Sequence, residues 1–568
     1  MDRDRPRLTR PGRRPNRLPR WFVAVLAAPP AVFLVVFYAA PFLTLLARGV
    51  VVDEVGDVLG RRRTWEVAWF TTWQATASTV LTLVVGIAPA YVVARFRFVG
   101  RRLLLGLLTA VFVLPTVVMG AAFSALLPAS LDRSIWAILA AHVVFNLAVV
   151  VRTVGAVWER LPPDLEAAAA TLGASPWRVL REATLPLLRP ALTAAGAIVF
   201  LFTFTSFGVI RILGTAARPT LEVEIWRRAT QLGEIGPAAV LAIIQLVALG
   251  VVVGWSTYSQ RRHSLAIAMR PATVTLRAAR RARRRRERIL VGLTATATAA
   301  VVTVPLLALV ERSMRSDDGY SLRAWRTLGD AEVRRGISVS VDPLGSLVRS
   351  IQTAAWATAL AVGIGAVAAL AVAAAGRLGR ALDTGLMLPI GTSAVTIGFG
   401  MLITFDTPPI DWRAEWWIVP VGHALVAVPF VVRVTLGVLR ALDPELIDAA
   451  ATLGASPTRA WREITLPNLW RPLVVGAGLA AAISLGEFGA TSFLSRSGQE
   501  TMPIAIERLL GRTGTVIQAQ GYALAVMLAA ATIAIVLAVD VTGDITGDVS
   551  GRRGRRRQKS KAAHARGR

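Results

Sequence analysis

Cysteine is absent from this chain of 568 residues, and charged residues make up only 17% of it. Without thiols the chain can form neither disulfides nor thiolate metal sites. A composition with 54% hydrophobic residues also excludes a soluble enzyme and a disordered chain. Apolar stretches of about 20 residues recur along the sequence, and each is long enough to cross a membrane as a helix. The sequence therefore predicts an all-α, polytopic membrane protein.

Lysine and histidine are also scarce. The two lysines, Lys559 and Lys561, do not follow a glycine, so the chain has no phosphate-binding P-loop. We therefore expect no catalytic residues and no bound cofactor, and any ATP hydrolysis must come from a separate subunit. With four histidines in the chain, His142 and His423 are expected to make hydrogen bonds between helices, and no metal site is predicted.

Positive charge is concentrated in three segments that flank apolar spans. Residues 1–20 carry a net charge of +6, residues 259–288 carry +10 and residues 549–568 carry +9, out of +29 for the whole chain. Such segments are typical of cytoplasmic flanks, so both termini and the central linker are expected inside. Aromatic residues are missing among these charges, which argues against nucleic-acid binding. The loop at 214–237, with three Arg and three Glu, is expected outside.

Twelve spans are predicted, six in each half of the chain. They lie at 21–47, 67–94, 103–127, 135–158, 191–213 and 238–258, and at 289–310, 351–375, 384–404, 415–439, 473–495 and 519–540. The predicted organisation is a basic N-terminus at 1–20, a first domain at 21–258, a linker at 259–288, a second domain at 289–540 and a basic tail at 541–568.

The two halves repeat each other. His142–Leu192 aligns without a gap on His423–Leu473, an offset of 281 residues, and 16 of the 21 positions from Ala168 to Leu188 are identical. The two halves are therefore homologous six-helix domains in the same membrane orientation.

The best-matched part of the repeat lies in an inner loop, after the fourth span of each half. Glu166–Pro186 (EAAAATLGASPWRVLREATLP) and Ile447–Pro467 (IDAAATLGASPTRAWREITLP) each predict an Ala-rich helix, a break at Gly and a second helix that begins near Pro176 or Pro457. Helices that merely lie on the bilayer are one interpretation. The other interpretation is that the loops dock onto two copies of one partner. Two closely matched copies on one side of the membrane favour this second interpretation.

These loops resemble the signature of the membrane permeases of ABC-type importers: EAA, three residues, Gly, nine residues, then Ile-x-Leu-Pro. The second loop fits from Asp448 and Ala449 through Gly454 to Pro467, with Asp in place of Glu. The resemblance implies that each loop inserts into a cleft of a cytoplasmic ABC ATPase subunit, two copies of which would bind the permease.

The first loop departs from this register. Counting back from Gly173 gives Ala167 and Ala168, and Glu166 comes one residue too early, although Pro186 is in place. The carboxylate is displaced by about 100° around a helix. Its salt bridge to the ATPase is therefore in doubt, and we expect the two contacts to differ.

The fused double layout, with SLGEFGATSFL (Ser484–Leu494) and ETMPIAIERLL (Glu500–Leu510), most resembles the ferric-iron and thiamine permeases. The resemblance implies a subunit of the cell membrane that receives its substrate from an extracytoplasmic binding protein. Ferric iron is the expected substrate, and thiamine or another small solute is the alternative.

Four residues are candidates for the translocation path. Glu487 occupies a predicted span where the first half has Ser206, and Phe488 matches Phe207. Charged residues at membrane depth are costly and are often functional. A place on the path and a carboxylate satisfied by a neighbouring helix are both compatible with the sequence.

A major-facilitator secondary transporter would also have six plus six helices and a basic central loop. The Gly100-Arg101-Arg102 run resembles a loop of that family, but it lacks the expected acidic residue just upstream. That family also has no paired Gly-Ala-Ser-Pro loops, so this class is the less favoured alternative.

Overall fold

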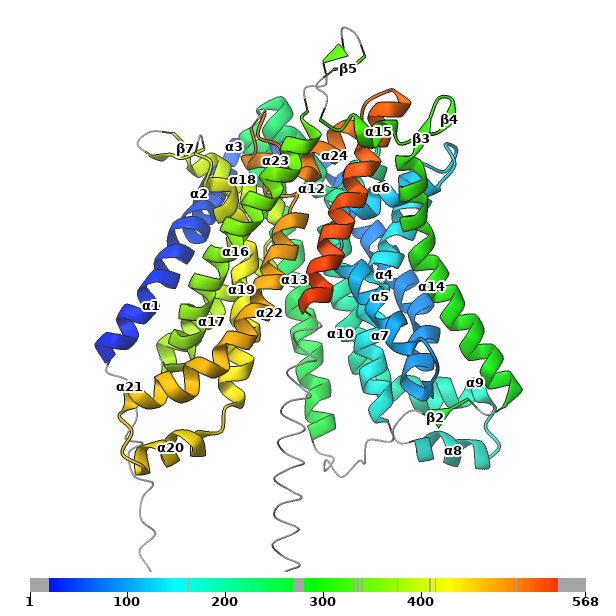
Figure 1. Ribbon diagram of the computed structural model, residues 1–568, viewed down its shortest axis with the longest axis vertical. Coiled ribbons are helices and arrows are strands. Elements are labelled where there is room, and N and C mark those ends of the chain that lie inside the picture. The colour runs from blue at the N-terminus through cyan, green and yellow to red at the C-terminus, as the bar shows by residue number, and fades with distance from the viewer. Residues whose placement is uncertain are drawn as a thin grey trace, which may run out of the picture.

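The computed structural model describes residues 20–539, apart from residues 162, 269–279, 283, 330–331, 335–336, 339–340, 375, 408–409, 414 and 497. Residues 1–19 of the predicted basic N-terminus and the whole predicted tail at 541–568 lie outside the described residues. Part of the predicted linker also lies outside them. Figure 1 shows a bundle of long helices with shorter helices and small hairpins at its two ends.

Ten helices in the described part of the chain are long and apolar enough to cross a membrane. The first comprises α1 (Arg20–Leu34), η1 (Val35–Ala39) and α2 (Ala40–Gly49), and the others are built on α4 (Arg62–Arg95), α7 (Ile135–Arg160), α10 (Leu185–Phe204), α13 (Ile235–Ala268), α14 (Arg285–Ser313), α16 (Pro343–Ala374), α19 (Ile418–Ala441), α22 (Leu466–Gly486) and Thr515–Val539. The all-α fold is confirmed.

Two predicted spans, at 103–127 and 384–404, are broken. The first consists of α5 (Arg101–Val113) and α6 (Thr116–Leu126), which meet at 106°, and the second of α17 (Gly376–Gly391) and α18 (Ala394–Thr404), which meet at 102°. The total is therefore up to twelve spans when each bent pair counts as one.

Local sequence explains both breaks. Leu114 has extended ψ (144°) because the proline ring of Pro115 disfavours helical backbone at the preceding residue. In the second half, Ser393 caps the new helix by accepting the Thr396 N–H at 3.2 Å. Hydropathy does not register either signal, since the apolar stretch continues through each break.

The remaining elements lie mostly at the two ends of the bundle. They are α3 (Val52–Gly60), α8 (Pro163–Thr171), α9 (Pro176–Arg178), η2 (Val179–Thr184), α11 (Gly208–Leu213), α12 (Leu221–Trp226), η3 (Arg227–Leu232), α15 (Arg323–Arg326), α20 (Pro444–Thr452), α21 (Pro457–Ala460), η4 (Trp461–Thr465), α23 (Thr491–Leu494) and α24 (Met502–Leu510). Strands β1 (Phe96–Arg97) and β2 (Arg280–Arg281) pair in parallel, and three antiparallel hairpins join β3 (Arg315–Ser316) to β4 (Gly319–Tyr320), β5 (Glu332–Arg334) to β6 (Ile337–Ser338) and β7 (Asp406–Thr407) to β8 (Ile410–Asp411).

Both repeated loops lie at one end of the molecule. Figure 1 shows α8, α9, α20 and α21 at the lower end, whereas β3, β4, β5 and β7 lie at the upper end. The two repeats therefore have the same orientation along the bundle, as a parallel duplication requires.

The first helix of each half packs against the other half. Residues of α1 and η1 share a buried core with α16, α17 and α19, and α14 packs against α4, α5 and α6 (Figure 1). This exchange interlocks the repeats, so that neither half is a separate packed body.

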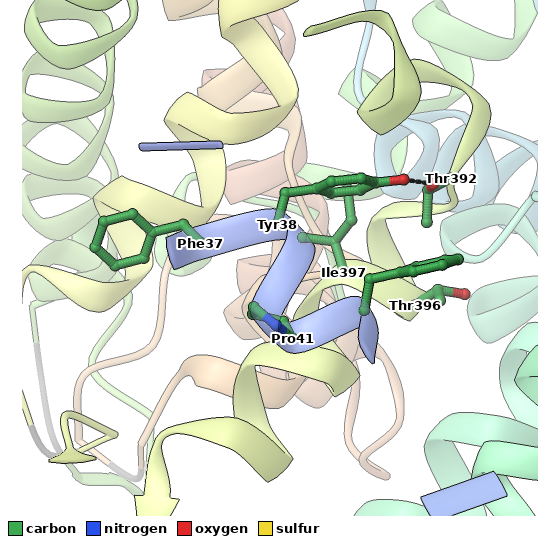
Figure 2. A pocket seen from close by; sticks show the side chains of 7 residues that line it. Phe37, Tyr38, Pro41, Thr392, Thr396 and Ile397 are labelled. Carbon is green, nitrogen blue, oxygen red and sulfur yellow. Dashed lines mark hydrogen bonds between the residues drawn. The ribbon is translucent and has the colours of Figure 1, made fainter. Parts of the chain in front are cut away.

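A small pocket marks the point where the first span meets the break between α17 and α18. The Tyr38 hydroxyl lies 2.6 Å from the hydroxyl of Thr392. Figure 2 marks this hydrogen bond with a dashed line. The pocket is lined by these two residues with Phe37, Pro41, Phe42, Thr396 and Ile397. The buried hydroxyl pair fixes the exchanged helix to the broken span of the other half.

The membrane orientation can be tested with single cysteines, because the native chain has none. Val99, in the loop between α4 and α5, is fully exposed, and Tyr320 in β4 is 73% exposed. We expect Val99→Cys to react with a membrane-impermeant maleimide only in permeabilised cells and Tyr320→Cys to react in intact cells. Reaction of both residues in intact cells would contradict the orientation.

Candidate coupling loops and translocation site

The two repeated loops have the same backbone design. In the first, α8 is followed by a tight turn, then α9 and η2 lead without interruption into the long helix α10. In the second, α20, α21 and η4 lead in the same way into α22. Pro186 and Pro467 lie in the first turn of α10 and α22, directly after the π-helical segments η2 and η4.

A glycine ends the first helix of each loop. Gly173 and Gly454 have φ of +83° and +82°, a left-handed conformation that other residues rarely adopt. The N–H of Ala174 then reaches back to the carbonyl of Ala169 at 3.1 Å, and the matching bond in the second loop is 2.9 Å. Each turn is a Schellman motif with glycine at its required position.

The Ser-Pro pair that follows starts the next helix. The hydroxyl of Ser175 accepts the N–H of Arg178 at 3.4 Å, and the corresponding bond of Ser456 is 3.3 Å. Pro176 and Pro457 occupy the first helical position after these caps. Each residue of the Gly-Ala-Ser-Pro motif except the alanine thus has a defined role in the turn.

A leucine protrudes at the tip of each turn. Leu172 is 89% exposed and Leu453 is 88% exposed. Neither side chain is buried by its own chain, although leucine gains about 1.5–3 kcal/mol from burial. Two equivalent exposed leucines on one end of the molecule fit docking onto a partner surface.

The first-loop carboxylate is bound within the chain. Arg95, at the end of α4, donates to Glu166 at 2.7 Å, and the Thr184 hydroxyl donates to the same oxygen at 3.4 Å. Glu166 therefore ties α8 to α4 and η2. Asp448 is exposed and has no ion pair with any described residue. The structure thus places the two carboxylates in different surroundings.

We expect Asp448→Ala to weaken ATPase binding about tenfold, because a charged hydrogen bond contributes ~1.5–3 kcal/mol. Glu166→Ala should instead lower the melting temperature of the permease, because Arg95 loses its partner. ATPase affinity and thermal unfolding of the purified permease separate the two effects. Equal losses of affinity with unchanged melting temperatures would refute this distinction.

The four path candidates lie where two long helices end. Ser206 and Phe207 follow α10, and Glu487 and Phe488 follow α22, so the predicted spans 191–213 and 473–495 are interrupted there. The Phe207 and Phe488 rings contact each other with centroids 5.0 Å apart. The two interrupted spans therefore meet directly across the boundary between the halves.

Close backbone packing explains the glycines that follow these phenylalanines. A Cβ on Gly208 would lie 2.9 Å from the backbone nitrogen of Val117, and one on Gly489 would lie 3.1 Å from that of Val395. In each half the interrupted span thus packs against the start of the second helix of the bent pair.

The two histidines make hydrogen bonds between helices. His142 lies 3.1 Å from the hydroxyl of Ser78 and 2.9 Å from that of Ser206, and His423 lies 2.7 Å from that of Thr491. Both ring nitrogens of each buried histidine have a hydroxyl partner. The rings therefore hold the interrupted spans in place.

The Glu487 carboxylate is 92% buried and accepts the N–H of Ala490 at 2.8 Å. This bond caps the short helix α23, so the side chain has a local structural role. Its charge is not neutralised by a basic side chain among the described residues.

A second buried carboxylate could not be recognised from the sequence, where it counts among the charges of an outer loop. Glu222 lies on α12, is 1% exposed and accepts the side-chain amide of Gln245 at 2.8 Å. It also lies near Ser393 of the other half and is close enough to Glu487 for their charges to interact.

Comparison with known sequences identifies the family. The model described as "Binding-protein-dependent transport system inner membrane component" matches twice, over residues 82–264 and 361–547. The chain belongs to this family and is an ABC importer permease with two fused domains. It is therefore a multi-pass membrane transport subunit and not an enzyme or a major-facilitator transporter.

Two similar proteins align over most of the chain, and a third aligns over part of it. The probable ABC transporter permease protein y4fN of Sinorhizobium fredii is 26% identical over 490 residues, which is 80% of this chain and 83% of that protein. The thiamine transport system permease protein ThiP of Escherichia coli K12 is 26% identical over 534 residues, which is 88% of this chain and 93% of that protein. The putative 2-aminoethylphosphonate transport system permease protein PhnV of Salmonella paratyphi A is 32% identical over 212 residues, which is 35% of this chain and 78% of that protein.

Proposed function

We propose that this chain forms the translocation path of a cell-membrane importer for a small cationic solute, with thiamine as the substrate. An extracytoplasmic binding protein delivers the solute, and two copies of a cytoplasmic ATPase supply the energy. Both termini lie in the cytoplasm, on the side of the two coupling loops.

The buried carboxylates where the halves meet support a cationic substrate. Glu222 and Glu487 bring two acidic groups to the boundary that the Phe207–Phe488 contact closes. A carboxylate at membrane depth lowers the electrostatic barrier for a cation and raises it for an anion. The thiazolium nitrogen of thiamine carries a permanent positive charge that suits such a boundary.

Relatives support thiamine as the first substrate to test. The ThiP proteins of Escherichia coli and of Brucella abortus are named thiamine permeases, and each aligns over at least 80% of this chain. Ferric iron, which the sequence motifs favour, remains the second candidate, since carboxylate oxygens are also suitable ligands for a hard metal ion.

Two long helices connect the coupling loops to this boundary. Helix α10 has 20 residues and α22 has 21, so each is about 30 Å long. A coupling loop is continuous with one end of each helix, and Phe207 or Phe488 follows the other end. Displacement of the loops by the ATPases would therefore be transmitted along α10 and α22 and would separate the two rings.

Uptake in a strain that lacks this chain tests the proposal. We expect loss of high-affinity uptake of radiolabelled thiamine and its recovery on expression of the wild-type chain, with uptake of radiolabelled ferric iron unchanged. Loss of iron uptake alone would transfer the assignment to ferric iron. Unchanged uptake of both would exclude both substrates.

A further inference from the structure

Five exposed arginines gather at the end of the bundle that carries the coupling loops, beside the first half. We call them the arginine patch: Arg97, Arg102, Arg284, Arg285 and Arg286. Within the described residues, none of these five side chains has an ion-pair partner. They come from two segments that are more than 180 positions apart in the sequence.

The backbone holds these segments together. Strand β1, which contains Arg97, pairs in parallel with β2, just before α14. Beneath this pairing, Phe96 packs with Val92 of α4 and Val291 of α14 in one buried cluster. The patch is therefore a fixed arrangement of charges and not a chance approach of two loops.

Two helices begin at the patch. Helix α5 starts at Arg101 and packs against α14, which starts at Arg285 and has 29 residues. The first-turn N–H groups of a helix and its dipole favour an anion. The guanidinium groups, which have no ion-pair partner among the described residues, and the start of α5 thus contribute positive potential to one region. Glu287, in the first turn of α14, accepts the N–H of Arg284 at 3.4 Å and offsets part of that potential.

Exposed apolar side chains lie directly beside the charges on the same two helices. Leu103 is 77% exposed, Ile289 is 58% exposed and Leu293 is 69% exposed. On spanning helices such side chains face the acyl chains of the bilayer. The region therefore offers positive charge next to a lipid-facing apolar surface, which matches the chemistry of an anionic phospholipid.

We propose that the arginine patch binds the headgroup of an anionic phospholipid of the inner leaflet, whose acyl chains lie along Leu103, Ile289 and Leu293. The phosphate contacts the guanidinium groups at the starts of α5 and α14. The bound lipid fixes α14, the helix of the second half that packs against the first, at the cytoplasmic surface. This site contains no residue of the coupling loops and does not depend on which substrate is transported.

A reporter at the patch tests the proposal. Leu103→Cys, carrying a fluorophore, is placed in phosphatidylcholine vesicles in which one lipid in five is brominated phosphatidylglycerol or, in a matched set, brominated phosphatidylcholine. We expect quenching at least about twofold stronger with the brominated phosphatidylglycerol, and a decline of this preference at high salt. Equal quenching by the two lipids would overturn the proposal.

Arginine variants locate the site. Arg97→Gln, Arg285→Gln and Arg286→Gln combined should remove the preference, and Arg471→Gln, an exposed arginine on α22 outside the patch, should retain it. If the triple variant fails to fold, the wild-type chain is measured at low and high salt. A preference for phosphatidylglycerol that declines at high salt supports binding, and a preference that does not change with salt contradicts it. Lipid binding at the patch would be contradicted if a folded triple variant kept the preference for phosphatidylglycerol. It would also be contradicted if the triple variant lost ATPase binding while keeping that lipid preference. Inorganic phosphate is also added to the vesicles. If the preference for phosphatidylglycerol persists, the patch binds the lipid and not merely a free anion.

Discussion

Replacing Gly454 with arginine is expected to release the ATPase from the second coupling loop and to lower uptake at least about tenfold, a loss of ~1.4 kcal/mol or more in coupling. Gly454 has φ of +82°, and a left-handed backbone costs other residues ~1–2 kcal/mol. The strain would displace the exposed Leu453 beside it, and the arginine side chain would occupy the docking surface. A pull-down of tagged ATPase and an uptake assay on the same membranes measure both effects.

Two variants control this result. A Cβ on Gly454 meets no atom within 4 Å, so Gly454→Ala isolates the cost of the backbone conformation, and we expect a smaller loss. Gly376→Arg introduces the same charge at another left-handed glycine in open surroundings, at the start of α17. It should keep ATPase binding. Normal ATPase binding and uptake in Gly454→Arg would show that the loop does not dock.

Neutralising the buried carboxylates should give the second large effect. In Glu487→Gln the new side chain still accepts the Ala490 N–H, so the cap of α23 is kept and only the charge is lost. We expect uptake of a cationic substrate to fall about tenfold, and further in the double variant with Glu222→Gln, because the barrier to the cation rises. Uptake per folded molecule is the quantity to measure.

Glu487→Ala separates the two roles of this residue. Alanine removes the cap as well as the charge, so we expect it to lower thermal stability by ~1 kcal/mol in addition to slowing uptake. If Glu487 serves only as a cap, the glutamine variant should transport at the wild-type rate, and the alanine variant should lose folded protein alone.

The coupling loops were the most predictable part of the structure. Gly173 and Gly454, each followed by Ala-Ser-Pro, specify a C-terminal turn and a new helix start through local chemistry, and the repeat shows the pattern twice. Short-range signals of this kind do not depend on what the rest of the chain does. The helix, turn and helix form as the sequence indicates.

Interactions between distant segments were not predictable in the same way. The exchange of α1 and α14 between the halves leaves no mark in hydropathy, because a span has the same composition whichever half it covers. The bends at Pro115 and Ser393 are hidden within continuous apolar stretches. Glu166 has its partner Arg95 71 residues away, so its internal ion pair depends on how the fold brings α8 to the end of α4.

Buried charge was the least visible feature. Glu487 was recognisable because it interrupts an apolar stretch, but Glu222 lies among other charges in LEVEIWRR, where it resembles a solvent-exposed loop residue. Only the folded chain shows that α12 turns inward and places Glu222 beside Ser393 and Gln245. A charged segment between two spans is thus not always a surface loop.

Site-specific photo-crosslinking tests most directly whether the two loops dock onto two ATPase copies. A photoreactive amino acid replaces Leu172, Leu453 or both, at the exposed tips of the loops. The account predicts one crosslinked ATPase copy with either single replacement and two copies per permease with the double replacement. Crosslinking only to lipid, or through one loop alone, would contradict it.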